Sequence, residues 1–133
     1  MRIELELELA KDFPFMRSRE SITSQHEEEY EAFYMDCGDG WYNVLRGLCQ
    51  EIQDAYCERG LEVDFLPTQI KEKFGGLRIY YDGAHKDMHD IVYNIVDKWT
   101  DVSYQTCEKC GAQGKVREDR SWLQTLCDQC WKR

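Results

Sequence analysis

The sequence predicts an α+β protein: a small antiparallel sheet, two to three helices packed on it, and a small C-terminal unit organised around cysteines. Three observations support this class. Two stretches repeat apolar residues at helical spacing, several short runs alternate apolar and polar residues, and four cysteines form two CxxC pairs near the C-terminus. We divide the 133 residues into an α+β domain over 1–104 and the cysteine unit over 105–133.

The four cysteines are the most specific feature of the chain. They are Cys107, Cys110, Cys127 and Cys130. Two residues between the cysteines of a pair allow both sulfurs to reach one ion, so the spacing predicts one structural Zn²⁺ with no open coordination position. Iron in the same cage is an alternative, and so is a redox CxxC pair, although no βαβ unit is visible beside it. Short strands over 115–120 and 122–125 would complete a zinc ribbon or treble clef.

The N-terminal half contains two further patterns. Apolar residues alternate with Glu4, Glu6 and Glu8, which predicts a strand with one acidic face, although Glu and Leu also form helices well. Ser24 and Glu27 have the spacing of a capping box, which predicts a short helix ending near Met35.

The middle of the chain predicts two helices around a hairpin. Apolar residues recur at helical spacing over 41–56, before Gly60, and again over 88–102. Between these helices we expect a strand over 61–67 and a hairpin of 69–74 with 77–81. Gly75 and Gly76 would form its two-residue turn, so that Phe74 faces Leu77.

One side of the predicted hairpin is basic. Alternation places Gln69, Lys71, Lys73, Arg78 and Tyr80 on the side away from the apolar residues. Such a stripe can bind phosphate, a carboxylate-rich surface or a stacked base. The alternative is that the strand carrying Glu4, Glu6 and Glu8 lies beside it and neutralises it.

The sequence shows no arrangement that demands a catalytic reading. His85 and His89 have a spacing that can place two imidazoles on one metal, but a surface role near a helix start explains them more simply. Neighbouring aspartates would raise the pKa of Cys37, which argues against a nucleophile. We therefore expect a protein that is not an enzyme.

Charge, hydropathy and cysteine content limit the classes of partner and the cellular compartment that we expect for this protein. The formal net charge is −9, from 26 acidic and 17 basic residues, which disfavours general nucleic-acid binding through phosphate contacts. No apolar run approaches membrane-spanning length, so no membrane association is expected. A thiolate metal site and an odd remainder of three cysteines suit a reducing compartment, and we expect a cytoplasmic protein.

Three segments together resemble a family of small, functionally unassigned proteins of bacteria and their phages. They are Cys37-Gly-Asp-Gly-Trp41, Gln69-Ile-Lys-Glu-Lys-Phe-Gly-Gly-Leu-Arg78, and the four-cysteine segment with Trp122-Leu-Gln-Thr-Leu-Cys127 between its pairs. The resemblance covers roughly residues 36–130. It implies a zinc-bearing C-terminus and a phage or mobile-element context, and it supplies no catalytic residues.

Two functions follow as hypotheses. The first is a zinc-stabilised acidic protein that binds a host protein through Glu4, Glu6 and Glu8, with Tyr30 or Tyr34 as anchors. Inhibition of a nucleic-acid-handling or defence complex is one form that this function could take. The second is a nucleic-acid-binding module that uses Lys71, Lys73, Arg78, Tyr80 and the basic residues of the zinc unit. The sequence does not define an oligomeric state.

Overall fold

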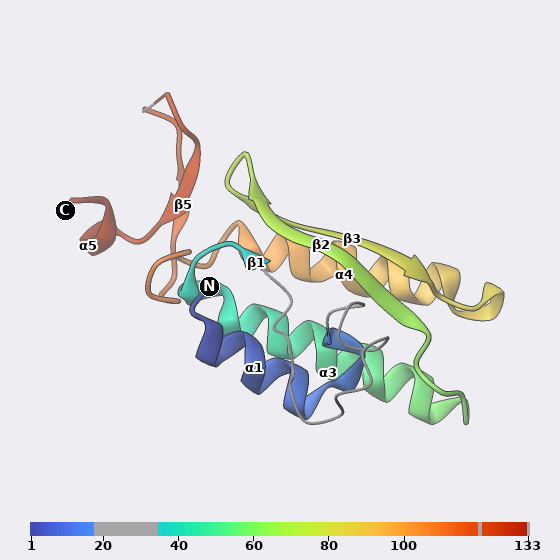
Figure 1. Cartoon of the computed structure of the whole chain (residues 1–133). Coiled ribbons are helices and arrows are strands. Elements are labelled where there is room, and N and C mark those ends of the chain that lie inside the picture. The colour runs from blue at the N-terminus through green and yellow to red at the C-terminus, as the bar shows by residue number, and fades with distance from the viewer. Residues whose placement is uncertain (18–34, 120, 133) are drawn as a thin grey trace.

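The protein, described by a computed structural model over residues 1–17, 35–119 and 121–132, is a mixed α+β structure. Within these residues lie four α-helices, a three-stranded sheet and a two-stranded sheet (Figure 1). The elements in chain order are α1 (Ile3–Asp12), η1 (Pro14–Met16), β1 (Met35–Asp36), η2 (Asp39–Trp41), α3 (Tyr42–Glu58), β2 (Phe65–Lys73), β3 (Gly76–Gly83), η3 (Lys86–Met88), α4 (His89–Ser103), β4 (Lys115–Arg117), β5 (Gln124–Leu126) and α5 (Asp128–Trp131). The predicted class is confirmed.

The N-terminal segment is a helix, so the predicted acidic strand is wrong. The buried positions of this segment are Glu6, Leu9, Ala10 and Phe13, which is the 3.6-residue period of a helix stripe rather than the period of a strand. Helix propensity of Glu and Leu therefore prevailed over the alternation. Glu4 and Glu8 remain exposed one turn apart, while Glu6 lies on the opposite side of α1 and is buried.

Glu6 connects α1 to the sheet. Its carboxylate accepts a hydrogen bond from the backbone N–H of Met35 in β1. Burial raises the pKa of Glu6, and the Met35 N–H opposes that rise. Removing this carboxylate would leave a buried backbone donor unpaired.

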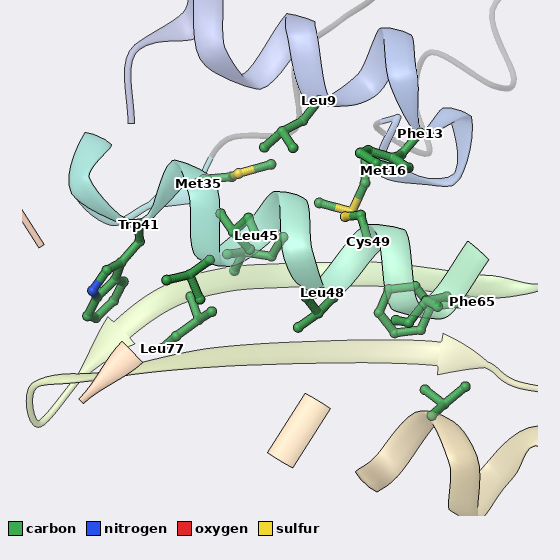
Figure 2. Close-up of a cluster of buried hydrophobic side chains, with 14 of the residues drawn as sticks. Leu9, Phe13, Met16, Met35, Trp41, Leu45, Leu48, Cys49, Phe65 and Leu77 are labelled. Atoms are coloured by element: carbon green, nitrogen blue, oxygen red, sulfur yellow. The ribbon is translucent and has the colours of Figure 1, made fainter. Parts of the chain in front are cut away.

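Helix α3 occupies the centre of the molecule. Figure 2 shows α3 between α1 on one side and strands β2 and β3 on the other. Leu45, Leu48 and Cys49 of α3 are all fully buried in the main hydrophobic cluster, which also contains Leu9 of α1 and Leu77 of β3. Helix α4 packs against α3, where Gly47 lies under the ring of Trp99. Both predicted central helices are confirmed.

The main sheet is mixed rather than purely antiparallel. Strand β2 pairs with β3 in antiparallel fashion, but β1 pairs with β2 in parallel, with Met35 opposite Ile70. Strand β2 runs through Pro67, where the register shifts, and the predicted strand over 61–67 begins only at Phe65. Proline can lie there because β1 covers only the far end of β2, and the irregularity accommodates its missing N–H.

The hairpin turn lies one residue earlier than predicted. Its central residues are Phe74 and Gly75, both with left-handed φ angles (54° and 86°), and Lys73 faces Gly76 across the turn. This is the geometry of a tight primed turn. The shift preserves the two faces of the hairpin, so Lys71 and Arg78 still share the side away from the core. Phe74, however, leaves the apolar side and becomes exposed.

Other predictions fall at the margins of the fold. The predicted helix between Ser24 and Met35, together with Tyr30 and Tyr34, lies outside the described residues. Strands β4 and β5 are shorter than the predicted 115–120 and 122–125. Among the described residues, none of the helices combines the length and the apolar character that a membrane crossing requires.

Candidate metal centre

The four cysteines converge on one point. Cys107 and Cys110 lie in the turn after α4, Cys127 caps the N-terminus of α5, and Cys130 lies in that helix. All four sulfurs lie within 4.8 Å of one another, and Cys110 Sγ is 3.6 Å from Cys127 Sγ. A tetrahedral shell with metal–sulfur bonds of about 2.3 Å requires sulfur separations of about 3.8 Å. The cluster therefore fits a metal ion.

The architecture around the cluster is a turn, a hairpin and a helix. The Cys107–Cys110 turn precedes the hairpin of β4 and β5, and α5 then supplies the second pair. Gly111 follows the first pair with φ +82°, as the sharp turn requires. This arrangement of turn, hairpin and short helix agrees with the predicted zinc-ribbon-like or treble-clef-like unit.

The protein environment shifts the pKa values of the four thiols in different directions. Burial raises the pKa of Cys107, but backbone N–H groups directed at its sulfur outweigh burial and lower the pKa to about 6. The N–H of Cys130, 3.4 Å from Cys127 Sγ, lowers the pKa of Cys127. Contact with Cys127 raises the pKa of Cys130 to about 12. In each pair, the pKa of one thiol is thus lowered and that of the other is raised, and binding of a metal ion would require all four thiols to lose their protons.

The first CxxC pair rests on the loop that contains Gly38 and Gly40. The Gly40 N–H donates to the Glu108 carbonyl at 2.8 Å, and a β-carbon on Gly40 would lie 2.1 Å from the Cys107 carbonyl oxygen. The buried indole of Trp41 donates to the Thr106 carbonyl at 2.9 Å. A β-carbon on Gly38 would likewise lie 2.3 Å from the Glu108 carbonyl oxygen, so this packing explains the glycines at positions 38 and 40.

The hairpin tip forms a second contact with the cysteine unit. The buried Thr125 hydroxyl donates to the Gly75 carbonyl at 2.6 Å. A β-carbon on Gly76 would lie 2.3 Å from the ring of Tyr104, at the end of α4. The three sequence segments that carry the family resemblance therefore meet at one place in the structure, and the cysteine unit packs on the α+β part.

The cysteine unit also engages one of its own basic residues. Arg117 is almost fully buried; its guanidinium donates to the Leu126 carbonyl at 3.1 and 3.0 Å and to Asp128 at 2.8 Å. It also lies over the Trp131 ring. Arg117 therefore stabilises the unit rather than facing a ligand. Lys115 and Lys132 remain exposed, whereas Arg120 and Arg133 lie outside the described residues.

The other sequence-derived candidates are distributed over separate surfaces. Lys71, Lys73 and Tyr80 lie on the outer hairpin face, with the Lys71 ammonium 5.7 Å from the centre of the Tyr80 ring. Arg78 shares this face, but its guanidinium donates to the Tyr104 hydroxyl at 2.8 Å. His85 and His89 are exposed, and among the described residues only the four cysteines form a metal-ligating cluster.

A cleft between the hairpin tip and the cysteine unit was not anticipated from the sequence. It has a volume of about 660 Å³ and is lined by Glu72, Lys73, Phe74, Ser121, Trp122 and Leu123. Phe74 and Trp122 are 66% and 68% exposed. Glu72 orders both walls, because its carboxylate accepts from the Gly75 N–H at 3.1 Å and from the Trp122 indole at 3.4 Å. The sequence did not indicate this cleft, because the predicted Gly75–Gly76 turn placed Phe74 in the strand and on its apolar side.

No protein-family model, curated protein or solved structure matches this chain.

Proposed function

We propose that the protein is a non-enzymatic binding protein, stabilised by one structural Zn²⁺, that holds a protein partner at the cleft between the hairpin tip and the cysteine unit. Zinc is the metal that a closed four-thiolate cage most commonly binds. Because protein sulfurs would fill all four positions, the ion would support the fold and leave no position for substrate.

The observation that carries the proposal is the conformation of Phe74. A bulky residue with φ 54° is strained by about 1 kcal/mol relative to asparagine or glycine, and the exposed ring adds contact of an apolar surface with water. Both features reduce stability, so folding alone does not explain them. Beside it, Trp122 exposes a second large ring, and exposed aromatic side chains on rigid elements are typical anchors of protein interfaces.

The decisive variant is Phe74→Asn. Asparagine tolerates the left-handed conformation, so this variant should be as stable as the wild type or more stable by about 1 kcal/mol, while it loses the anchor. Ile3→Asn is a matched control, because Ile3 is an exposed apolar residue on α1.

Affinity capture from a nuclease-treated bacterial lysate, with stoichiometry measured by mass spectrometry, tests the proposal. Wild type and Ile3→Asn should retain the same stoichiometric protein, and Phe74→Asn should lose it. Equal retention by all three chains would refute the cleft as the binding site. The phage context and the inhibition of a host complex remain predictions from the family resemblance.

Nucleic-acid binding is the second candidate, and one structural observation favours it. The acidic segment expected to neutralise the basic hairpin face is helix α1, not a neighbouring strand. Among the described residues, Lys71 and Lys73 form no ion pair, although Asp36 lies opposite Lys71 in the register. Lys71→Gln with Lys73→Gln should weaken binding of a labelled single-stranded oligonucleotide and reduce its salt dependence. Unchanged anisotropy titrations would exclude this face.

A further inference from the structure

A groove separates the outer edge of β3 from helix α4. It has a volume of about 540 Å³, and its lining includes Ile79 and Tyr81 of β3 and Tyr93, Asp97 and Asp101 of α4. It shares no lining residue with the cleft at the hairpin tip. Tyr93 is 63% exposed although it stands on a helix that packs against the core.

Strand β3 has an unpaired outer edge at this groove. The sheet order is β1-β2-β3, so β3 has a strand on one side only. Lys73 and Gly76 close the two-residue turn as a hydrogen-bonded pair, and alternation then directs the backbone groups of Leu77 and Ile79 away from β2. Leu77 confirms this direction, because its N–H donates to Ser103 Oγ at 2.9 Å and its carbonyl accepts from Thr100.

Helix α4 therefore covers the edge at Leu77 but leaves it open further along. Among the described residues, the Ile79 N–H and carbonyl have no partner outside the strand pairing. Such an edge is a template for a further extended strand. At about 3.3 Å per residue, the free edge from Arg78 to Tyr81 can pair with about four residues.

The helix side of the groove specifies the side chains of that strand. Asp97 and Asp101 stand four residues apart on α4, and neither takes part in an ion pair among the described residues. Residues at this helical spacing lie about 5–6 Å apart, close to the distance of about 6.6 Å between alternate residues of a strand. Two basic side chains at alternate positions thus match the two carboxylates, and the methylene stems can pack on Tyr93.

We propose that this groove binds an extended peptide segment of a partner protein, which adds to β3 as an antiparallel fourth strand and places alternate lysine or arginine side chains against Asp97 and Asp101. The inference does not depend on the cleft at the hairpin tip. Among the described residues, Arg78 is the one cation that lines the groove, and its guanidinium donates to the Tyr104 hydroxyl at 2.8 Å.

The test uses fluorescein-labelled peptides of alternating valine and lysine, eight residues long, with a valine–glutamate peptide as charge control. Two N-methylated versions distinguish strand addition from charge attraction. In antiparallel pairing, the residue opposite Ile79 directs its side chain toward α4 and its backbone toward β3. Methylation of the backbone amide nitrogens of the lysine residues should therefore abolish binding. Methylation of the backbone amide nitrogens of the valine residues should not. Equal affinities of the two methylated peptides would overturn the proposal.

Protein variants provide the second arm of the test. Asp97→Asn with Asp101→Asn should weaken binding of the valine–lysine peptide about threefold to tenfold, as expected for two exposed ion pairs. Glu118→Gln with Asp119→Asn makes the same change in net charge on exposed residues of the cysteine unit and should have no effect. If both double variants weakened peptide binding equally, the effect would come from the net charge of the protein, and Asp97 and Asp101 would not form the binding site.

Two further readouts identify the occupant. On peptide binding, the amide of Ile79 should gain protection from hydrogen exchange in NMR spectra, whereas protection confined to other segments would refute edge pairing. Sedimentation of the protein alone should show a monomer; a dimer that the peptide dissociates would assign the edge to a second copy of the chain instead. Phe74→Asn should leave peptide affinity unchanged. The test of the groove beside β3 is therefore independent of the test of the cleft at the hairpin tip.

Discussion

Replacement of Gly40 by alanine should weaken folding and metal binding together. The new β-carbon would lie 2.1 Å from the Cys107 carbonyl oxygen and 2.6 Å from the Glu108 carbonyl oxygen. Both are backbone atoms that cannot rotate away, so either the loop before α3 or the first CxxC turn must move. Such a movement changes the position of two of the four sulfurs.

The magnitude follows from two costs. Inserting a methyl group into a tightly packed site costs about 1–3 kcal/mol, and loss of the 2.8 Å hydrogen bond from Gly40 to Glu108 adds about 1 kcal/mol. A total of about 2–4 kcal/mol should lower the Tm of a chain of this size by roughly 6–20 °C. If about 1.4 kcal/mol of this cost destabilises the metal-bound state relative to the metal-free state, the affinity for zinc falls about tenfold.

Gly60→Ala is the matched control. Unlike Gly40, Gly60 has a positive φ, of 65°, and no atom lies within 4 Å of the position that a β-carbon would take. This variant should lose only about 1 kcal/mol of stability to backbone strain and keep the zinc affinity of the wild type. Thermal unfolding followed by circular dichroism and zinc competition against a chromogenic chelator measure both quantities. Indistinguishable Tm and zinc affinity for the two variants would show that the contact between the Gly40 loop and the CxxC turn carries no energy.

Three other changes probe the remaining contacts. Cys110→Ser, or chelation of the wild type, should unfold the chain from about Cys107 onward; a native-like thermal transition in metal-free protein would contradict a structural ion. Trp41→Phe leaves the Thr106 carbonyl unpaired and should cost about 1–3 kcal/mol in denaturant unfolding, a cost that an unchanged midpoint would disprove. Glu6 has a folded-state pKa above its ordinary 4.5, so the folded state binds more protons and stability should fall as pH rises from about 4.5 through that raised value. Glu6→Gln should remove this dependence of stability on pH and keep the hydrogen bond from the Met35 N–H. Glu6→Ala should lose that hydrogen bond and about 1–3 kcal/mol of the free energy of unfolding. If the pH dependence persists in Glu6→Gln, another group causes it.

The convergence of the four cysteines and the central helices were predictable because each depends on local spacing. Two CxxC pairs bring their own turn geometry, and the apolar stripes of α3 and α4 are long enough to define a period. The predicted basic face of the hairpin is also present, because moving the turn by one residue leaves each side chain on the predicted side of the hairpin.

The errors arose where a local pattern had two readings. Strict alternation of Glu and Leu near the N-terminus suggested a strand, but the buried stripe that includes Glu6 and Leu9 follows a helix. The buried Glu6 carboxylate there accepts a hydrogen bond from the distant Met35 N–H. Gly75 and Gly76 suggested the turn, but Gly76 is glycine because the Tyr104 ring packs on it. Contacts across long sequence separations decided both cases, and no short window of sequence contains them.

The contact between the first CxxC turn and the Gly40 loop has a consequence for how the chain is made. A ribosome releases the chain from its N-terminus at about 5–20 residues per second, so Trp41 and the hairpin tip emerge well before Cys127 and Cys130. During that interval the surfaces that later cover the metal unit have no partner. The cysteine unit can cover these surfaces only after the second cysteine pair has emerged, and we expect a chain truncated before Cys127 to leave Gly75 and the Gly40 loop accessible to proteases.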